Sequence, residues 1–309
     1  MPSVKRLAAK AASGGRGKRV AHENSALAIH HGGQKSVDSQ HQNAVMGDSG
    51  HCRSVHRGTR AAIAEIREQW RQRQSWHRAE KSLTLQAKAM CRRLVGGDKT
   101  DADKLYAAVI DKGMHPQSFN AASAIAPLLI ARDHIEASRK LIEKRLIKLV
   151  AELPVAPWIE TVRGLGSLSV AGIIGEAGDL SLYINPGKLW KRMGLAVFDG
   201  QRQRRVTGVE ALEQGYSPSR RSLMWTIGDC MIRAQKESDP YKILYAARRV
   251  YTATTHPDWT KGHSHNDAKR YIEKRLLREL WRAWRAANGA VNSDGVLPSA
   301  VSFSVAATG

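Results

Sequence analysis

The chain has 309 residues, with 49 Lys or Arg against 28 Asp or Glu, so its formal net charge is +21. No stretch reaches the roughly 18 consecutive apolar residues of a membrane-spanning helix, so we expect no membrane contact. The three cysteines are widely separated, which argues against a disulfide framework or a CxxC metal site. So large an excess of positive charge predicts a polyanionic partner, most often nucleic acid.

The N-terminal segment, residues 1–60, is rich in Gly, Ser, Asn, Gln and His and has almost no apolar periodicity. It cannot bury enough apolar surface to offset the entropy of ordering, so we expect a disordered basic arm. The charge is not confined to this arm, because residues 1–60, 61–150 and 151–309 each carry a net charge of +7.

Residues 61–153 are predicted to be helical. Apolar residues recur at helical spacing over 60–94, and a second helix is expected over 100–113. A third is expected over 118–153, either interrupted or kinked near Pro127.

Within residues 130–153 the apolar positions follow spacings of seven, four, three and four, which is typical of a coiled-coil seam. These positions are Ile135, Ile142, Leu146, Leu149 and Leu153. The seam predicts either a homodimer through 130–153 or a single helix packed on its own chain.

Pro154 and Pro157 mark a boundary, after which residues 154–287 form a predicted helical domain. Helices are expected at 158–163, 168–177, 186–194, 219–237, 240–253 and 268–287. Short strands are expected at 196–198 and 205–206, a basic loop at 199–216, and a disordered tail at 288–309.

The sequence Gly164-Leu165-Gly166, between apolar residues, is typical of the turn in a helix-hairpin-helix. Glycine permits a positive φ there and lets the backbone approach a phosphate, which would meet the free N–H groups of the next helix. The alternative is a turn that simply joins two helices.

Further motifs follow in the order Glu176-Ala-Gly-Asp179, Tyr183, a helix containing Lys188, and Gly194-Leu195. In this order the sequence from about Leu141 to Arg285 resembles the C-terminal domain of the insertion-sequence-110 family of transposases, the RNA-guided serine recombinases of mobile elements. The resemblance implies a mainly α DNA-binding domain that acts in DNA transposition or recombination, with a guide RNA as a second partner and a location at the bacterial nucleoid in the cytoplasm.

The resemblance also implies a serine nucleophile at the start of a helix, where Ser217 matches best and Ser219 second. A helix N-terminus and neighbouring guanidinium groups could stabilise charge on a phosphate attacked there. The alternative is that these serines only cap the helix. The family's Gly-Asn after the serine is replaced by Arg220-Arg221, and its Leu-Arg pair by Leu223-Met224.

The family's N-terminal metal-binding domain, which resembles RNase H, is not evident before residue 130. We therefore predict no cofactor and no metal site, with Mg²⁺ required only if a partner supplies that domain. The loop residues His256, His263 and His265 with Asp258 and Asp267 could bind a metal, but they lack zinc spacing and are interpreted as a polar loop.

The candidate DNA-binding residues are glycines of the hairpin and cations of the following segments. They are Gly164, Gly166, Lys188, Arg192, Arg202, Arg204, Arg205, Arg220, Arg221, Arg278 and Arg282. Arg278 and Arg282 belong to a basic strip on the last helix, suited to phosphates. The alternative is a solvated face whose arginines pair with Glu273 and Glu279.

The sequence thus predicts a transposase-like DNA-binding protein with Ser217 as nucleophile. Two alternatives from other classes stay open. One is a non-catalytic DNA- or RNA-binding accessory protein derived from such a transposase, and the other is a structural protein that dimerises through 130–153.

Overall fold

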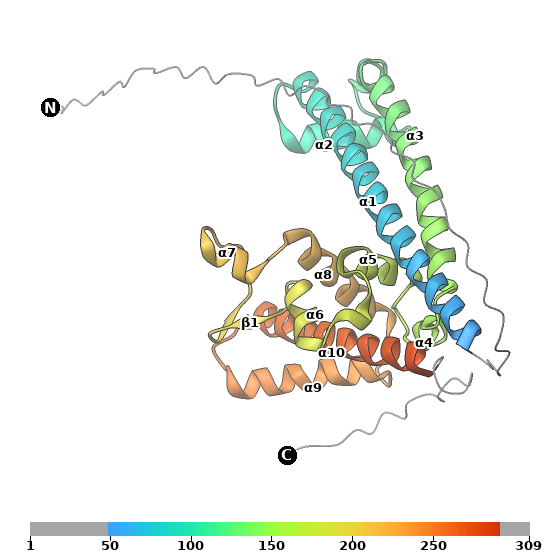
Figure 1. Ribbon diagram of the computed structural model, residues 1–309. Coiled ribbons are helices and arrows are strands. Elements are labelled where there is room, and N and C mark those ends of the chain that lie inside the picture. Colours follow the sequence, from blue (N-terminus) through green and yellow to red (C-terminus); the bar gives the residue numbers. More distant parts are fainter. Residues whose placement is uncertain (1–48, 291–309) are drawn as a thin grey trace, which may run out of the picture. The chain divides into compact units, whose positions relative to one another are not determined.

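The computed structural model describes residues 49–290, which are mainly α-helical, as the sequence predicts (Figure 1). The first three helices are α1 (Ser49–Leu94), α2 (Lys99–Ile110) and α3 (Ser118–Ala151). They are followed by α4 (Ala156–Thr161), α5 (Ser167–Ala177), the 3₁₀ helix η1 (Leu180–Leu182) and α6 (Pro186–Arg192). The chain then forms β1 (Val197–Phe198), β2 (Gln201–Arg202), α7 (Val209–Gln214), α8 (Pro218–Ala234), α9 (Pro240–Thr255) and α10 (Lys261–Ala290).

The predicted disordered segments are wrong where the structure describes them. Helix α1 already begins at Ser49, so residues 49–60 are helical, and α10 continues through 288–290. Extending a formed helix adds a backbone hydrogen bond for each residue fixed, and neither stretch contains a proline to stop it. Residues 1–48 and 291–309, which hold the rest of the predicted arm and tail, lie outside the described range.

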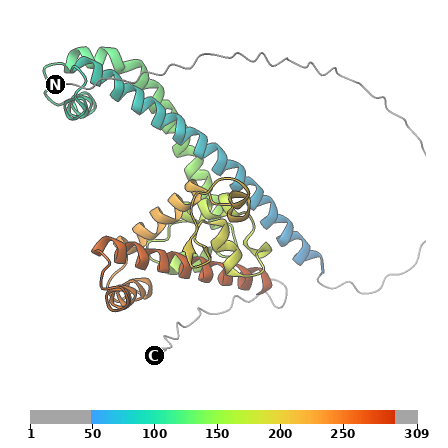
Figure 2. The same ribbon diagram turned by 90° about the vertical axis from the view of Figure 1, so that its left-hand side faces the viewer.

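Helices α1 and α3 run side by side in opposite directions, with α2 at one end of the pair, in both views (Figures 1 and 2). Ion pairs link them in antiparallel order, Arg145 to Glu65 at 2.8 Å, Arg73 to Glu143 at 2.9 Å and Arg139 to Glu80 at 2.7 Å. Beside α2 the pair encloses a small apolar cluster, which consists of Ala87, Cys91, Ala102, Leu105, Ala121 and Ile125.

The seam of α3 packs within its own chain. Leu146, Leu149 and Leu153 are buried in the main hydrophobic core, and Ile142 packs against it. Leu146, Leu149 and Leu153 thus pack within their own chain. The homodimer through 130–153 stays a prediction. Helix α3 is one element across Pro127.

The main core is centred on α5, whose residues 170–174 are all buried and which contacts α1, α3 and α8. It combines Ile63, Ile66 and Trp70 of α1 with residues from α3 to α10. Apolar packing is therefore continuous across the expected boundary at Pro154.

The segment predicted as a loop at 199–216 contains two further elements, β2 and α7. Strand β1 pairs with Gln201–Arg202 and not with the predicted 205–206. Asp199 and Gly200 both have positive φ, 47° and 74°, as a two-residue hairpin turn requires, and this turn sets the pairing register.

Two helical glycines provide a test of the contact between α5 and α1. A Cβ at Gly175 would overlap the Trp70 side chain, whereas a Cβ at Gly58 would meet nothing within 4 Å. We expect Gly175→Ala to lower the free energy of unfolding by roughly 1–3 kcal/mol through overpacking. The matched change Gly58→Ala should raise it by up to about 1 kcal/mol, because alanine is the better helix former. Urea unfolding measures both, and equal stability of the two variants would contradict this contact.

Candidate nucleic-acid interface

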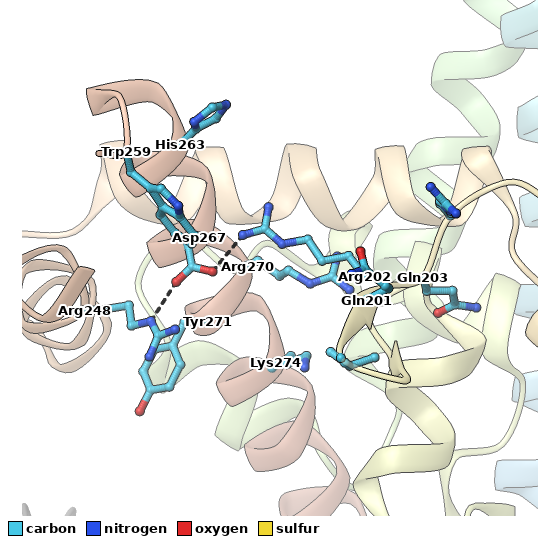
Figure 3. Close-up of a pocket in the computed structure, with 13 residues that line it drawn as sticks. Gln201, Arg202, Gln203, Arg248, Trp259, His263, Asp267, Arg270, Tyr271 and Lys274 are labelled. Atoms are coloured by element: carbon cyan, nitrogen blue, oxygen red, sulfur yellow. Dashed lines mark hydrogen bonds and ion pairs between the residues drawn. The ribbon is translucent and has the colours of Figure 1, made fainter. Parts of the chain in front are cut away.

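A basic pocket of about 700 Å³ lies between the β1–β2 hairpin, α9 and α10 (Figure 3). Five lining residues are cationic and one, Asp267, is acidic. The cations are Arg202, Arg204, Arg248, Arg270 and Lys274, and the rest of the lining includes Gln201, Gln203, Trp259, His263 and Tyr271. A cleft lined by one sign of charge concentrates the field of that charge, so this pocket attracts anions.

The face of α10 that lines the pocket consists of His263, Asp267, Arg270, Tyr271 and Lys274. Their spacings of four, three, one and three place them along one side of a helix over about 16 Å. Two of these residues, His263 and Asp267, fall in the stretch predicted as a polar loop before a helix at 268. That prediction is wrong, because α10 already begins at Lys261. The Thr260 hydroxyl accepts a hydrogen bond from the His263 backbone N–H at 3.2 Å and so caps α10 earlier.

Asp267 joins the hairpin to the two helices. Its Oδ1 accepts from Arg202 at 2.9 Å and its Oδ2 from Arg248 at 2.7 Å, so the carboxylate is shared between two guanidinium groups (Figure 3). The Arg248 guanidinium also lies 4.5 Å from the centre of the Tyr251 ring and 5.4 Å from that of Tyr271. Arg248 is thus held in place by the protein itself.

Arg204, Arg270 and Lys274 have no carboxylate partner within the described residues. Arg270 is buried, and its guanidinium donates to the Ala196 carbonyl at 2.9 Å. Burial, followed by the charges of Arg221 and Arg202, lowers the pKa of Arg270 to about 10. Burial and Arg270 also lower the pKa of Lys274. The pocket therefore holds three cations that have no ion-pair partner among the described residues.

At the end of the pocket opposite Lys274 lies an aromatic group. The Trp259 indole is half-buried and stacks on His256, with ring centres 4.2 Å apart and planes 8° from parallel. His263 approaches its edge at 6.4 Å, and the Arg202 guanidinium lies 5.9 Å from its centre. In the described part of the chain no three His, Cys, Asp or Glu side chains are grouped as a metal site would require.

Behind the pocket, a buried charge cluster joins α10 to α8. Glu273 is fully buried, accepts a hydrogen bond from Arg221 at 2.7 Å and leaves its Oε1 without a partner. Lys269 is also fully buried, with its Nζ 3.8 Å from Asp229 and 3.4 Å from the centre of the Trp225 ring. Burial raises the pKa of Glu273 to about 7, against the opposing charge of Arg221.

A turn at Gly164–Gly166 joins α4 to α5, and helix packing explains one of its glycines. Gly164 has a φ of +86°, and a Cβ there would lie 2.9 Å from the Met231 Cα of α8. Helix packing thus accounts for this glycine without a phosphate. Gly166 precedes α5 with open space where a Cβ would stand, and Lys188 is exposed in the first turn of α6.

Four of the predicted cations are held by protein acceptors near the end of α5 or on α10. Arg192 donates to the Glu176 carbonyl at 2.9 Å, and Arg220 pairs with the Glu176 carboxylate at 3.2 Å. Arg278 and Arg282 pair with Glu279 at 2.8 Å and 3.5 Å, as the alternative of a solvated face expects. Its other expected acid, Glu273, pairs instead with Arg221 of α8.

The predicted serines lie at the start of α8. Ser217 is the N-cap residue, but its hydroxyl accepts no backbone hydrogen bond from the helix. Its Oγ lies 3.0 Å from the Oγ of Ser219. No titratable side chain in the described residues hydrogen-bonds to either hydroxyl.

The structure therefore brings together only part of the predicted set. Arg202 and Arg204 line the pocket, and Arg205 is exposed just after them. The sequence pattern did not indicate Arg248, Trp259, Arg270 or Tyr271 as site residues. Thr260, recognised as the cap of α10, would have placed the pocket-lining residues of that helix on one face. No local sequence signal associates Arg248 of α9 with them.

No family model, no curated protein and no solved structure matches this chain. Among residues 49–290, no helix is long and apolar enough to cross a membrane.

The buried Glu273 predicts a pH dependence of stability. Its pKa is about 7 in the folded protein and 4.5 when unperturbed, so folding favours the protonated carboxyl. Its contribution to stability is full below about pH 4.5 and is lost as the pH rises through about 7, a loss on the order of 3 kcal/mol.

We therefore expect a lower free energy of unfolding at about pH 8 than at about pH 5. Glu273→Gln should remove most of this difference, while Glu237→Gln, at an exposed position, should retain it. Urea unfolding of the three proteins at both pH values measures it. Equal pH dependence in all three would contradict the assignment to Glu273.

Proposed function

We propose that this chain is a DNA-binding protein that holds its ligand by backbone phosphates in the basic pocket. The observation that carries the proposal is the set of cations Arg204, Arg270 and Lys274, which line one pocket and lack a carboxylate partner among the described residues. Holding like charges together in a folded protein is unfavourable unless an anion binds there. A nucleic-acid backbone supplies such anions in series.

The rest of the chain supports the same proposal. The net charge of +21 is spread over all three regions, which favours long-range attraction to a polyanion. The side chains around the pocket are those that contact phosphates in protein–DNA complexes, chiefly Arg, Lys and Gln. A DNA-binding protein of this kind would be located at the nucleoid.

Removing one unpaired cation of the pocket should weaken DNA binding in a salt-dependent way. We expect Arg204→Gln and Lys274→Gln each to lower the affinity for a fluorescently labelled DNA oligonucleotide. Each should also reduce the steepness of the log–log salt dependence by about one unit, because one fewer counterion is released. Fluorescence anisotropy between roughly 50 and roughly 200 mM salt measures both quantities.

The matched control is Arg233→Gln, which removes one positive charge from an exposed position of α8 outside the pocket. It should bind DNA nearly as the unmodified protein does. The proposal fails if the control loses as much affinity as the two pocket variants, or if the unmodified protein shows no salt-dependent binding.

A second candidate function is DNA strand transfer with Ser217 as the nucleophile, as the resemblance to insertion-sequence-110 transposases implies. It is favoured by the Ser217 hydroxyl, which occupies the N-cap position of α8 without bonding to the helix backbone. In such a step the Ser217 Oγ would bond to phosphorus and displace a sugar hydroxyl. Any Mg²⁺ or guide RNA would come with a partner.

If Ser217 attacks DNA, the unmodified protein should form a covalent protein–DNA adduct that survives denaturing electrophoresis. Ser217→Ala should abolish the adduct while leaving the anisotropy-measured affinity unchanged, and Ser222→Ala, one turn further along α8, should retain it. If the unmodified protein forms no adduct on any branched or linear DNA, strand transfer by this chain alone is excluded and DNA binding remains.

A further inference from the structure

The basic pocket contains an aromatic ring that phosphate binding does not require. The Trp259 indole lines the pocket and is half-buried. His256 stacks on one face of the indole at 4.2 Å and so fixes its orientation. A rigid, preoriented aromatic ring loses little entropy when a flat ligand stacks on its other face.

The second feature is the position of the cations relative to this ring. Trp259 and His263 stand at one end of the pocket-lining stripe of α10, and Lys274 stands about 16 Å away at the other end. Arg270 lies between them (Figure 3). A short stretch of single strand has the same arrangement, with a flat base at one end and the phosphates of the adjoining backbone beyond it.

The third feature is Arg202, which the hairpin holds over the pocket. Its guanidinium lies 5.9 Å from the centre of the indole and pairs with Asp267 at 2.9 Å. Guanidinium planes stack on nucleic-acid bases as aromatic rings do. A base stacked on Trp259 would therefore lie beside the Arg202 guanidinium.

The size of the pocket favours an unpaired nucleotide over a duplex. At about 700 Å³, it is within the range of sites that enclose most of a small organic ligand. A base inside a duplex is stacked and paired, so it reaches such a pocket only if it is extruded at a cost of a few kcal/mol. A base of a single strand is already available.

We propose that the basic pocket binds an unpaired nucleotide of a single-stranded nucleic acid, with its base on Trp259 and the adjoining backbone phosphates on Arg270 and Lys274. The inference rests on the proposed binding of nucleic-acid phosphates and specifies which form of nucleic acid the pocket takes. DNA and RNA strands share this chemistry.

The test compares ligands that share a phosphate backbone and differ in their bases, their pairing or their sugar. The probes are a labelled oligothymidylate strand, an abasic DNA strand of equal length and a blunt duplex of that length, with an oligouridylate strand to distinguish RNA from DNA. Fluorescence anisotropy on the full chain measures each affinity. We expect the base-bearing strands to bind roughly 5- to 150-fold more tightly than the abasic strand, which is the range for one stacked base.

Trp259→Ala should remove this preference and leave the affinity for the abasic strand unchanged, and Trp259→Phe should restore most of it. The control is Trp76→Ala, which removes a partly exposed indole from α1 and should keep the full preference. Circular dichroism confirms that the variants are folded.

Equal binding of the abasic and base-bearing strands by the unmodified protein would overturn the inference, as would a preference for the duplex. A base preference that Trp259→Ala leaves intact would also overturn it. In each of these outcomes salt-dependent binding still supports the proposed function, whereas the loss of all salt-dependent binding would mean that the proposed function itself has failed.

Discussion

The position of the pocket depends on the close contact between α8 and α10. A Cβ at Gly228 of α8 would lie 2.8 Å from the Glu273 Oε1, so only glycine lets α10 approach this closely. In this contact Glu273 and Lys269 are fully buried, and Arg221 reaches from α8 to pair with Glu273. Buried charges are tolerated only when such partners remain in place. The inner face of α10 is therefore fixed, and this fixes which residues of its outer face line the pocket.

The cations on the inner face of α10 lie near acidic partners, whereas most of those on its outer face do not. On the inner face Arg221 is compensated by Glu273, and Lys269 lies near Asp229. On the outer face Asp267 is shared between two arginines, and the remaining cations are uncompensated by carboxylates in the described part of the chain. Their mutual repulsion destabilises the free protein slightly, and a bound anion relieves it. A ligand that neutralises the pocket should thus stabilise the fold, since binding to the native state adds to its stability.

Periodicity and glycine placement predicted the helices well, because these are local properties of the sequence. The departures have local physical causes too: Asp199-Gly200 is a hairpin turn that pairs β1 with 201–202, and Thr260 caps α10 before residue 268. The candidate site was predicted only in part, because it joins Arg202, Arg248 and Arg270 from three elements far apart in sequence. Gly164 illustrates a further limit. A glycine at this position permits a phosphate-binding turn, but it equally permits the close approach of helix α8, and the sequence does not distinguish the two.

The pocket and the candidate serine are connected through Arg221. Its backbone N–H donates to the Ser217 carbonyl at 3.1 Å, so Arg221 stands one turn after the serine on α8. Its guanidinium pairs with Glu273, and its charge contributes to the lowered pKa of Arg270 in the pocket wall. A phosphate bound at Arg270 would weaken the repulsion between Arg270 and Arg221 and so favour the packing that positions the start of α8. Under the proposed function, nucleic acid in the pocket would therefore stabilise the contact between α8 and α10, and Ser217 lies at the start of α8.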